Sequence, residues 1–511
     1  MREAVFCKEM KMLDSNTIEN IGIPSCVLME RAALKTAEEM EKRFPKSKKE
    51  ERILCVCGSG NNGGNGVAIA RILKLHGYRA EIFPAGNPEH RTEETARQFS
   101  IAEKYQVPVV NNPGWDEYTT IVDALFGVGL ARPVEGEYAR LIGEMNRADA
   151  WKVAVDLPSG IDGDTGAVLG TAFRADLTVT FAFRKAGLCL YPGRKLAGRI
   201  EVADIGIYRE ESLMEGLRYL EDADLAAFPE RDPDANKGTF GRVLMVAGSK
   251  GMCGAAYLGS AAALASGVGM VKILTHEANR IPLQTLLPEA MVDCGETEED
   301  WEKAFGWCDV LVIGSGLGLS ELSRKKARWF LEHAAGEKKP VVLDADGLNI
   351  LAQENGLRDL VGAHVVLTPH MGEAARLTGR TIGELKTDRT ASAWNLARDL
   401  GAVCVLKDSC TVTAGPEGEI WYNLSGNPGM AAAGSGDVLA GVIAGMLCLE
   451  RTADGQGTAN SHTRAAALGA YLHGRAGDLA AAEKGMYGMK AGDIIPAVAN
   501  VIQHRGNHEK I

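Results

Sequence analysis

The 511-residue sequence has no basic stripe interleaved with aromatic residues, and its formal net charge is −11. Because nucleic acids are bound mainly through clustered lysine and arginine, this absence argues against a nucleic-acid partner. The longest apolar run, VLAGVIAGMLCL, is shorter than the roughly 18 residues that suggest a membrane span. Since Asp437 and Glu450 bracket this run, we expect a buried helix there and no membrane association.

The N-terminus also lacks the apolar core of a signal peptide. The eleven cysteines are an odd number, and most lie inside apolar runs such as ILCVCG and AVCVLKDSC. Such cysteines are typical of buried, reduced thiols, so we predict a cytoplasmic protein. Cys55 and Cys57 have no second pair or histidine cluster nearby, so no zinc site is expected.

Glycine, by contrast, is abundant at 60 residues, and many glycines follow short apolar runs. The length exceeds the roughly 250–300 residues of one hydrophobic core, which predicts two domains. Strand-like runs alternate with helical stretches in both halves, a pattern typical of α/β folds with parallel sheets. We expect a helix over residues 13–43 and a linker in the acidic segment 208–236.

A loop with five glycines and three asparagines, GSGNNGGNG at residues 58–66, follows the first strand-like run. Its backbone N–H groups can bind an anion, while carboxamides offer oxygens to a cation and NH₂ groups to a phosphate or amide. Asp123 and Asp156 follow two further strand-like runs, the second within VDLPSGIDGDTG. Each loop alone is compatible with a simple turn, but three loops at one sheet edge favour a binding site.

These segments, together with GIPSCVLMERAA and DALFGVGL, resemble the NAD(P)H-hydrate epimerase domain over residues 1–215. The resemblance implies a Rossmann-like three-layer domain that holds a potassium ion through Asn62, Asp123 and Ser159. The substrate contacts that it implies come from Asn61, Asn62, Gly63, Gly64, Asn65, Gly127, Val128, Gly129, Leu130, Ala131, Arg132, Pro133 and Asp156. The implied reaction inverts C6 of a hydrated nicotinamide ring, and Asp156 is the expected general acid/base. Where the family usually has NNGGDG, this chain has a neutral amide, Asn65.

The second half contains NPGMAAAGSGDVLAG at residues 427–441. GSGD at the start of an apolar helix offers N–H groups to a phosphate and places Asp437 beside it, although Asp437 is also compatible with a simple helix cap. Asp344 and Asp346 lie at the end of another strand-like run. They are candidates for residues beside a magnesium ion or a phosphate. His370 precedes a helix, where a histidine is also compatible with a hydrogen-bonding loop residue.

With KGTFGRVLMVAGSKGMCGAA and VLKDSCTV, these motifs resemble the ADP/ATP-dependent NAD(P)H-hydrate dehydratase, a relative of ribokinase-like kinases, over residues 223–505. The implied nucleotide contacts are Lys407, Asp408, Ser409, Cys410, Thr411 and Gly436. The implied contacts with the hydrated cofactor are Ala255, Gly318, His370 and Asp437. Asp437 would accept the proton of the C6 hydroxyl while that oxygen attacks the terminal phosphate of the nucleotide, with Mg²⁺ steadying the charge.

The sequence therefore predicts an N-terminal Rossmann-like domain and a C-terminal ribokinase-like α/β domain in one repair enzyme. Its substrates would be hydrated NADH and NADPH (NADHX and NADPHX). K⁺, Mg²⁺ and ADP or ATP would be required, with ADP the expected co-substrate, and we expect a homo-oligomer. The alternative is a ribokinase-like small-molecule or vitamin kinase whose N-terminal domain binds a ligand without catalysis.

Overall fold

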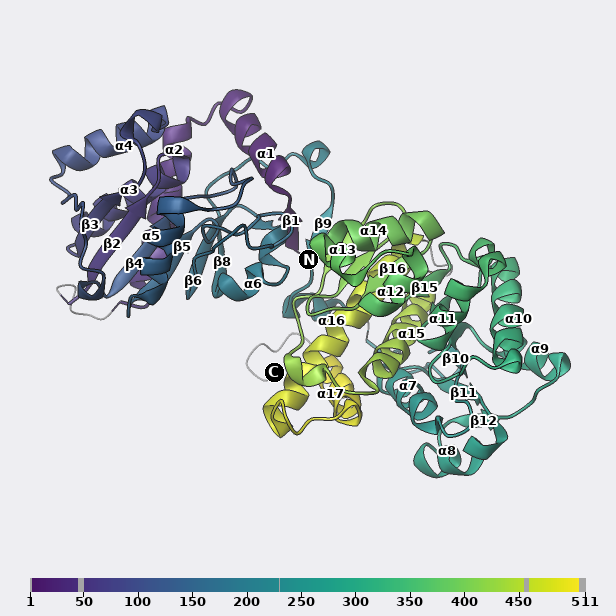
Figure 1. Cartoon of the computed structure of the whole chain (residues 1–511). Coiled ribbons are helices and arrows are strands. Elements are labelled where there is room, and N and C mark those ends of the chain that lie inside the picture. The colour runs from purple at the N-terminus through teal and green to yellow at the C-terminus, as the bar shows by residue number, and fades with distance from the viewer. Residues whose placement is uncertain (1, 45–49, 229, 455–458, 505–511) are drawn as a thin grey trace. The chain divides into compact units, whose positions relative to one another are not determined.

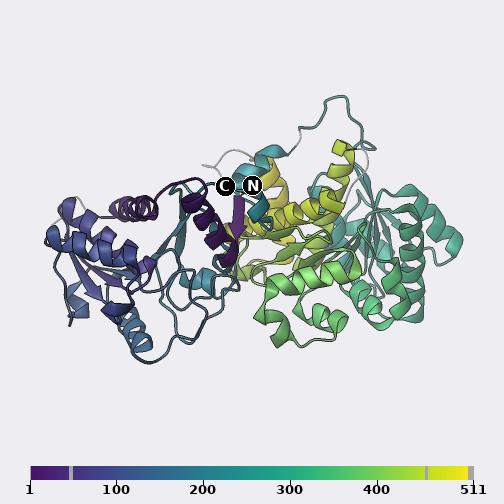
Figure 2. The same ribbon diagram turned by 90° about the horizontal axis from the view of Figure 1, so that it is seen from above.

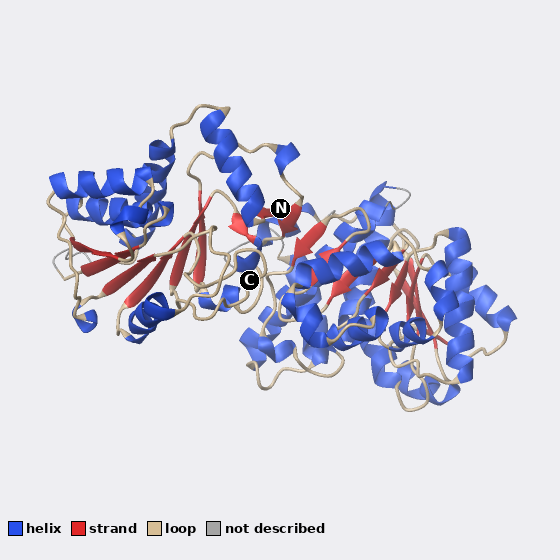
Figure 3. Ribbon diagram, turned by 45° about the horizontal axis from the view of Figure 1, so that its top comes forward, coloured by secondary structure: helices blue, strands red, loops and turns tan. Residues whose placement is uncertain are grey.

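The computed structural model of the chain describes residues 2–44, 50–228, 230–454 and 459–504. The chain divides between Leu217 and Arg218 into two compact units. The N-terminal unit comprises Glu3–Leu217, and the C-terminal unit comprises Arg218–Ile511 together with Met1–Arg2. Both units combine parallel strands with helices on both sides of the sheet, as Figure 3 shows in red and blue. This arrangement confirms the predicted α/β class.

The six-stranded sheet of the N-terminal unit is parallel throughout. In spatial order its strands are β3 (Arg79–Pro84), β2 (Arg52–Cys57), β4 (Thr120–Ala124), β5 (Trp151–Val155), β6 (Leu177–Phe181) and β8 (Arg199–Ala203). A further parallel pair, outside this six-stranded sheet, joins β1 (Arg2–Val5) to β7 (Arg184–Lys185). The chain leaves β2 in opposite directions to reach β3 and β4, so the sheet has its topological switch point between β2 and β4.

Two helical layers cover this sheet (Figure 1). The helices of the unit are α1 (Cys7–Glu19), α2 (Ser25–Glu41), α3 (Asn61–Leu75), α4 (Glu93–Lys104), α5 (Gly136–Arg147) and α6 (Gly193–Leu196). Alternate residues of β2 face opposite layers, because Cys55 and Cys57 pack with α2 and α3 while Leu54 and Val56 pack with α5. A parallel sheet buried on both faces explains why its strands are continuous apolar runs.

The predicted helix over residues 13–43 is wrong, because α1 and α2 are separate helices. Gly22 adopts a φ of 87° between them, a left-handed conformation that favours glycine. Pro24 then precedes the first residue of α2 and has no N–H to continue α1. The break lets α1 and α2 take different directions, and both border the cavity described below.

The sheet of the C-terminal unit is parallel from β12 to β16 and ends in an antiparallel meander. In spatial order its strands are β12 (Met291–Asp293), β11 (Met270–Leu274), β10 (Arg242–Val246), β13 (Val310–Ile313), β14 (Val341–Leu343), β15 (Val365–Leu367), β16 (Val403–Leu406), β17 (Val412–Ala414) and β18 (Ile420–Tyr422). The order reverses between β10 and β13, so the loops after these strands meet at a second switch point.

The helices of this unit are α7 (Cys253–Ala265), α8 (Arg280–Leu286), α9 (Glu298–Trp307), α10 (Glu321–Glu337), α11 (Asp346–Gln353), α12 (Met371–Thr378), α13 (Ile382–Thr387), α14 (Arg389–Leu400), α15 (Ser435–Asp454), α16 (Ala459–Lys484) and α17 (Ala491–Gln503). The last three lie side by side and share a core with α7 (Figures 1 and 2). The run VLAGVIAGMLCL lies within α15, and its Val438 and Val442 are fully buried, as predicted. No helix in the described part of the chain is long and apolar enough to cross a bilayer.

The acidic segment 208–236 is more ordered than a simple linker. It contains β9 (Leu217–Tyr219) and a 3₁₀ helix at Asp222–Ala227. Leu225 and Phe228 are buried in the core of the C-terminal unit. These apolar residues, spaced among the acidic ones, anchor the segment to the core. The acidic composition of the segment gave no sign of this packing.

Candidate active sites

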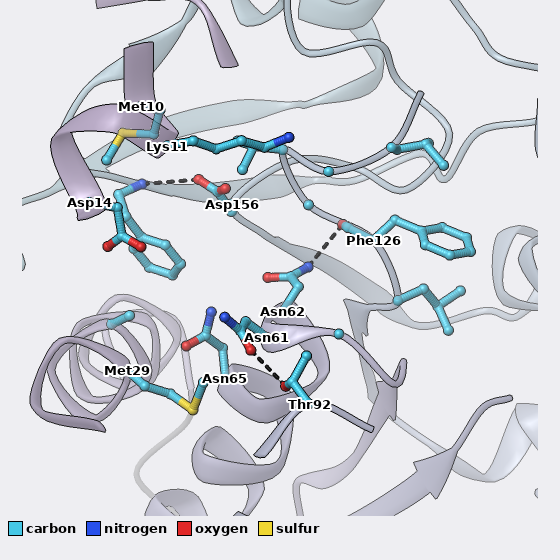
Figure 4. A pocket seen from close by; sticks show the side chains of 18 of the residues that line it. Met10, Lys11, Asp14, Met29, Asn61, Asn62, Asn65, Thr92, Phe126 and Asp156 are labelled. Carbon is cyan, nitrogen blue, oxygen red and sulfur yellow. Dashed lines mark hydrogen bonds between the residues drawn. The ribbon is translucent and has the colours of Figure 1, made fainter. Parts of the chain in front are cut away.

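A cavity of about 700 Å³ opens in the N-terminal unit at the carboxyl ends of β2, β4, β5 and β6 (Figure 4). This edge of the sheet holds the switch point, where parallel α/β folds bind ligands. The start of α3, which follows β2, contributes Asn61, Asn62 and Asn65 to the lining. The loop after β4 contributes residues 125–132, and α1 and α2 complete the wall.

The asparagines at the start of α3 present amide groups to this cavity. Asn62 donates from Nδ2 to the carbonyl oxygens of Phe126, at 2.9 Å, and Val155, at 3.0 Å. Asn61 accepts a hydrogen bond of 2.6 Å from the Thr92 hydroxyl. These bonds fix both amides, and Figure 4 shows them with Asn65 around one opening. The start of α3 can therefore offer both donors and acceptors to a polar ligand.

Two of the predicted contact residues, Gly63 and Gly64, are not among the residues that line the cavity. A Cβ at Gly63 would lie 1.8 Å from the carbonyl oxygen of Gly58, and one at Gly64 would lie 2.9 Å from the Met29 side chain. These glycines allow the first turn of α3 to pack directly against its own loop and α2. Pro133, likewise, is outside the lining, whereas Arg132 belongs to it.

Substitution Gly63→Ala is expected to destabilise the N-terminal unit by roughly 1–3 kcal/mol, because the backbone must move to admit the methyl group. Gly60→Ala is the matched control, since a Cβ at Gly60 meets nothing within 4 Å. Hydrogen-exchange mass spectrometry of peptides from this unit would measure both changes. Equal protection in the two variants would contradict the packing argument.

Asp123 and Ser159 form a buried hydrogen-bond network beneath the cavity. The Asp123 carboxylate accepts from Ser159 N and Ser159 Oγ, each at 2.7 Å, and from Leu125 N at 3.2 Å. Ser159 Oγ in turn accepts from Phe126 N at 3.0 Å. Burial raises the pKa of Asp123 to about 6, although its hydrogen bonds oppose the shift. Within the described part of the chain, no lysine or arginine pairs with this carboxylate.

Asp156 is ion-paired with a buried lysine, Lys185, which the sequence analysis missed. Lys185 Nζ donates to Asp156 Oδ1 at 2.5 Å and to Thr180 Oγ1 and Phe181 O at 3.0 Å each. The Lys185 side chain is 1% exposed, and Val5 of β1 pairs with it in register. Oδ1 of Asp156 also accepts from Thr180 Oγ1 at 3.1 Å. No donor in the described chain contacts Oδ2, which leaves this oxygen for a ligand.

The C-terminal unit places Asp437 in the first turn of α15, where helix N–H groups can bind an anion. Burial, followed by repulsion from Asp344, raises the pKa of Asp437 to about 6. Lys407 Nζ pairs with Asp344 Oδ1 at 2.8 Å, and a Cβ at Gly436 would lie 3.4 Å from the same nitrogen. Burial tends to lower the pKa of Lys407, but the charges of Asp344 and Glu373 outweigh it. The net pKa is raised, so the amine stays charged.

His370 lies beside Lys407, because residues 370 and 407 form a bridge between neighbouring chain segments. Its Nδ1 accepts from Gly372 N at 2.9 Å and Glu373 N at 3.3 Å, which caps α12. Burial and the Lys407 charge lower its pKa, so the ring is neutral and carries its proton on Nε2. The side chain is 54% exposed. His370 therefore caps α12, and its Nε2 lies 3.4 Å from Glu373 Oε1.

The glycine loop after β13 completes this region. Gly316 and Gly318 have φ values of 59° and 76°. A Cβ at Gly316 would lie 2.9 Å from Cβ of Ala255, so the two residues are in close contact. Gly318 N donates to Asp346 Oδ2 at 2.8 Å. Asp346 is also near enough to Asp437 to raise its pKa, so Gly318 and Asp437 belong to one cluster.

Two family models match the chain in succession. The model of the YjeF-related protein N-terminus matches residues 25–187, and that of NAD(P)H-hydrate dehydratase matches residues 243–500. The bifunctional NAD(P)H-hydrate repair enzyme Nnr of Moorella thermoacetica is 38% identical over 528 residues, covering 98% of this chain and 96% of that protein. Its counterpart in Thermofilum pendens is 37% identical, covering 94% and 92%.

The chain belongs to the family of bifunctional NAD(P)H-hydrate repair enzymes. A solved structure of the ADP/ATP-dependent NAD(P)H-hydrate dehydratase from Bacillus subtilis, co-crystallized with ATP and Mg²⁺, is 31% identical. It covers 56% of this chain and 98% of that chain, with a TM-score of 0.46. The family-model match over residues 243–500, together with the parallel sheet, confirms the predicted ribokinase-like fold of the second half.

In this repair-enzyme chain the predicted nucleotide segment, residues 407–411, is the turn between β16 and β17. Lys407 faces the first turn of α15, but Asp408 is paired with Arg389 at 2.6 Å. The Cys410 side chain is buried. Oδ2 of Asp408 is therefore already occupied by Arg389, and a nucleotide contact from Cys410 would involve its backbone.

A second residue that the sequence analysis missed is His473 of α16. Its Nε2 lies 3.4 Å from the hydroxyl of Ser435 in the GSGD motif. Burial, with the neighbouring Lys407 charge, lowers its pKa to about 4, so the ring is neutral near pH 7. The only local signal was a lone histidine in the apolar helical run AALGAYLHGRAG.

Proposed function

We propose that the chain restores hydrated NADH and NADPH in two steps. The N-terminal unit interconverts the R and S epimers, and the C-terminal unit dehydrates the S form at the expense of ADP or ATP. The observation that carries this proposal is the position of Asp437 in the first turn of α15, beside the Lys407 ammonium. This arrangement combines a base for an alcohol with cationic and N–H groups for a phosphate.

In the epimerase cavity, Asp156 is the expected acid–base group. Oδ1 is fixed by Lys185 and Thr180, so Oδ2 can exchange a proton with the C6 hydroxyl. The amides of Asn61, Asn62 and Asn65 are suited to the polar carboxamide or phosphate groups of the substrate. The substrate contacts proposed for residues 127–132 agree with their place in the lining.

The donor set beside Asn62 fits a potassium ion. The carbonyl oxygens of Phe126 and Val155 converge on the Asn62 amide, and the nearby Asp123 carboxylate is buried without a basic partner among the described residues. Buried oxygens of this kind, with one uncompensated carboxylate, suit a hard monovalent cation. We propose that Asn62, Asp123 and Ser159 hold K⁺. When bound, the ion would supply positive charge that compensates Asp123.

Removing potassium should therefore lower epimerisation by about tenfold, which corresponds to roughly 1.4 kcal/mol of lost stabilisation. Dehydration of pure S-NADHX should stay unchanged, because that step belongs to the other unit. Binding is checked separately by titrating K⁺ and following hydrogen exchange in residues 120–126. Protection that is equal in KCl and tetramethylammonium chloride, or that survives Asp123→Asn, would contradict the site.

In the dehydratase site, Asp437 accepts the proton of the C6 hydroxyl, and the oxygen attacks the terminal phosphate of the nucleotide. The N–H groups at the start of α15 and the Lys407 ammonium stabilise the charge that develops on the phosphate. The phosphate then leaves C6 as the ring nitrogen donates its lone pair, and loss of a C5 proton gives NADH or NADPH. With ADP, the other products are AMP and phosphate.

Mg²⁺ is expected to enter this site with the nucleotide. No group of three or more His, Cys, Asp or Glu in the described chain is arranged to hold a metal ion by itself. Mg²⁺ commonly binds through one or two carboxylates together with substrate phosphates. Asp344 and Asp346 are the carboxylates that raise the pKa of Asp437. We propose that these two residues lie beside the Mg²⁺ ion when it binds with the nucleotide.

The test is to incubate the purified full chain with mixed-epimer NADHX, ADP, MgCl₂ and KCl, and to follow the reduced-nicotinamide absorbance. Complete recovery with release of phosphate is expected. Recovery of only the S fraction would restrict the activity to the C-terminal unit. A stable phosphorylated product would instead favour a small-molecule kinase. A homo-oligomer and a cytoplasmic location stay predictions, which light scattering and fractionation would check.

A further inference from the structure

The epimerase cavity contains a second carboxylate that no motif pointed to. Among the residues that line the cavity, the acidic ones are Asp14 and Asp156. Asp14 comes from α1, whereas Asp156 follows β5. Figure 4 shows both side chains bordering the same space, with Asp14 on the α1 side. A ring bound in this cavity could therefore contact both carboxylates.

Asp14 has no role in holding the fold together. Within the described chain its carboxylate makes no hydrogen bond or ion pair, although Lys11 lies one turn before it on the same helix. Glu9, also on α1, is the opposite case. Its carboxylate accepts from Phe6 N at 2.6 Å and from Glu215 N, so it caps the helix and ties down a distant loop.

Burial, and then the charge of Asp156, raise the pKa of Asp14, while Lys185 opposes the shift. The other charged residues of the lining are Lys11, Arg132, Asp156 and Lys185, and of these Asp156 and Lys185 act on the pKa of Asp14. Asp156 is ion-paired and Asp14 is not. The ion-paired Asp156 therefore suits the role of the base, and the unpaired, partly buried Asp14 suits the role of the acid.

We propose that Asp14 is the second acid–base group of the epimerase, acting on C6 from the face opposite Asp156. This inference rests on the proposed epimerase function. In one direction Asp14, as the acid, gives its proton to the C6 hydroxyl. The C6–O bond breaks, water leaves, and the lone pair of the ring nitrogen forms an N1=C6 double bond. Water then adds to C6 from the other face, and Asp156 accepts its proton.

The reverse reaction runs with the two roles exchanged. After one inversion Asp156 carries the proton and Asp14 is charged, which is the state required to act on the other epimer. Atoms and charge balance over each inversion, because one water leaves and one enters. No oxidant, reductant or nucleotide takes part. A single carboxylate could serve only one face of the ring without turning the substrate over.

The experiment uses the full chain without nucleotide, so that dehydration cannot consume either epimer. Asp14→Asn should lower kcat for R-to-S interconversion by at least about 100-fold, the usual contribution of a general acid or base. KM should change by less than about threefold, since the amide keeps the shape of the side chain. In H₂¹⁸O, inversion by the wild-type chain should place one ¹⁸O at C6, and this incorporation should fall with kcat in Asp14→Asn.

Glu9→Gln is the matched control on the same helix, because it removes a structural carboxylate. It should reduce protection of α1 against hydrogen exchange and leave kcat unchanged. If Asp14→Asn keeps kcat within threefold, or changes only KM, the inference is wrong while the epimerase function stands. If Glu9→Gln lowers kcat as much as Asp14→Asn does, loosening of α1 explains the loss and the inference is wrong as well. If the wild-type chain does not interconvert the epimers, both the inference and the function fail.

Discussion

Asp437→Asn should reduce nucleotide-dependent dehydration of S-NADHX by about 10²–10⁴-fold, the range expected for loss of a general base. The amide keeps the shape of the side chain at the start of α15 but cannot accept the proton of the C6 hydroxyl. Epimerisation should persist at the wild-type rate, because its groups belong to the other unit. Initial rates of absorbance recovery with ADP and MgCl₂ measure the first effect, and chromatography of the epimers measures the second.

The pH dependence gives a second test of the same residue. Burial and Asp344 raise the pKa of Asp437 to about 6. Because a base must be unprotonated, the wild-type dehydration rate should fall as pH drops through about 6 and reach a plateau above it. A plateau that continues well below pH 6 would exclude Asp437 as the base.

Asp493→Asn is the matched control for a capping role. Asp493 also lies in the first turn of a helix, α17, where it accepts from Lys490 N at 2.7 Å. If Asp437 only capped α15, the two variants would lose similar stability and keep similar activity. Dehydration that survives in Asp437→Asn would remove the basis for the mechanism of the C-terminal unit.

Lys185→Met should reduce epimerisation by about 10²–10⁴-fold at neutral pH. Without the ammonium, the buried Asp156 carboxylate loses its counter-ion and the donor that fixes Oδ1. Initial rates of epimer interconversion would measure this loss.

The same substitution breaks a buried ion pair and should destabilise the N-terminal unit by about 3–5 kcal/mol. Lys185→Arg keeps the charge and is the variant to use if Lys185→Met does not fold. Lys152→Met is the control, since Lys152 Nζ donates to the carbonyl oxygens of Ala148 and Ala150 and lies outside the cavity lining. A wild-type rate of epimerisation in a folded Lys185→Met would show that the pair is structural only.

Most of the fold could be predicted from local pattern. Short apolar runs followed by glycine loops indicated parallel strands, since such strands are buried on both faces and their loops meet at one edge. The helix over residues 13–43 was wrong because apolar spacing continues across Gly22 and Pro24, where the backbone turns. Substrate contacts from Gly63 and Gly64 were expected because the family resemblance implies them, and in the structure these two glycines allow close packing.

The sequence alone determined the two-domain α/β architecture, the membership in a repair-enzyme family and the prominence of Asp156 and Asp437. These features depend on contiguous motifs, in which each residue can be recognised from its neighbours in the sequence. The tertiary structure decided that Lys185 pairs with Asp156, that His473 reaches Ser435, and that Asp14 borders the epimerase cavity. A lone lysine, histidine or aspartate has no local signature of its role, because its partners are brought to it only when distant strands and helices pack together.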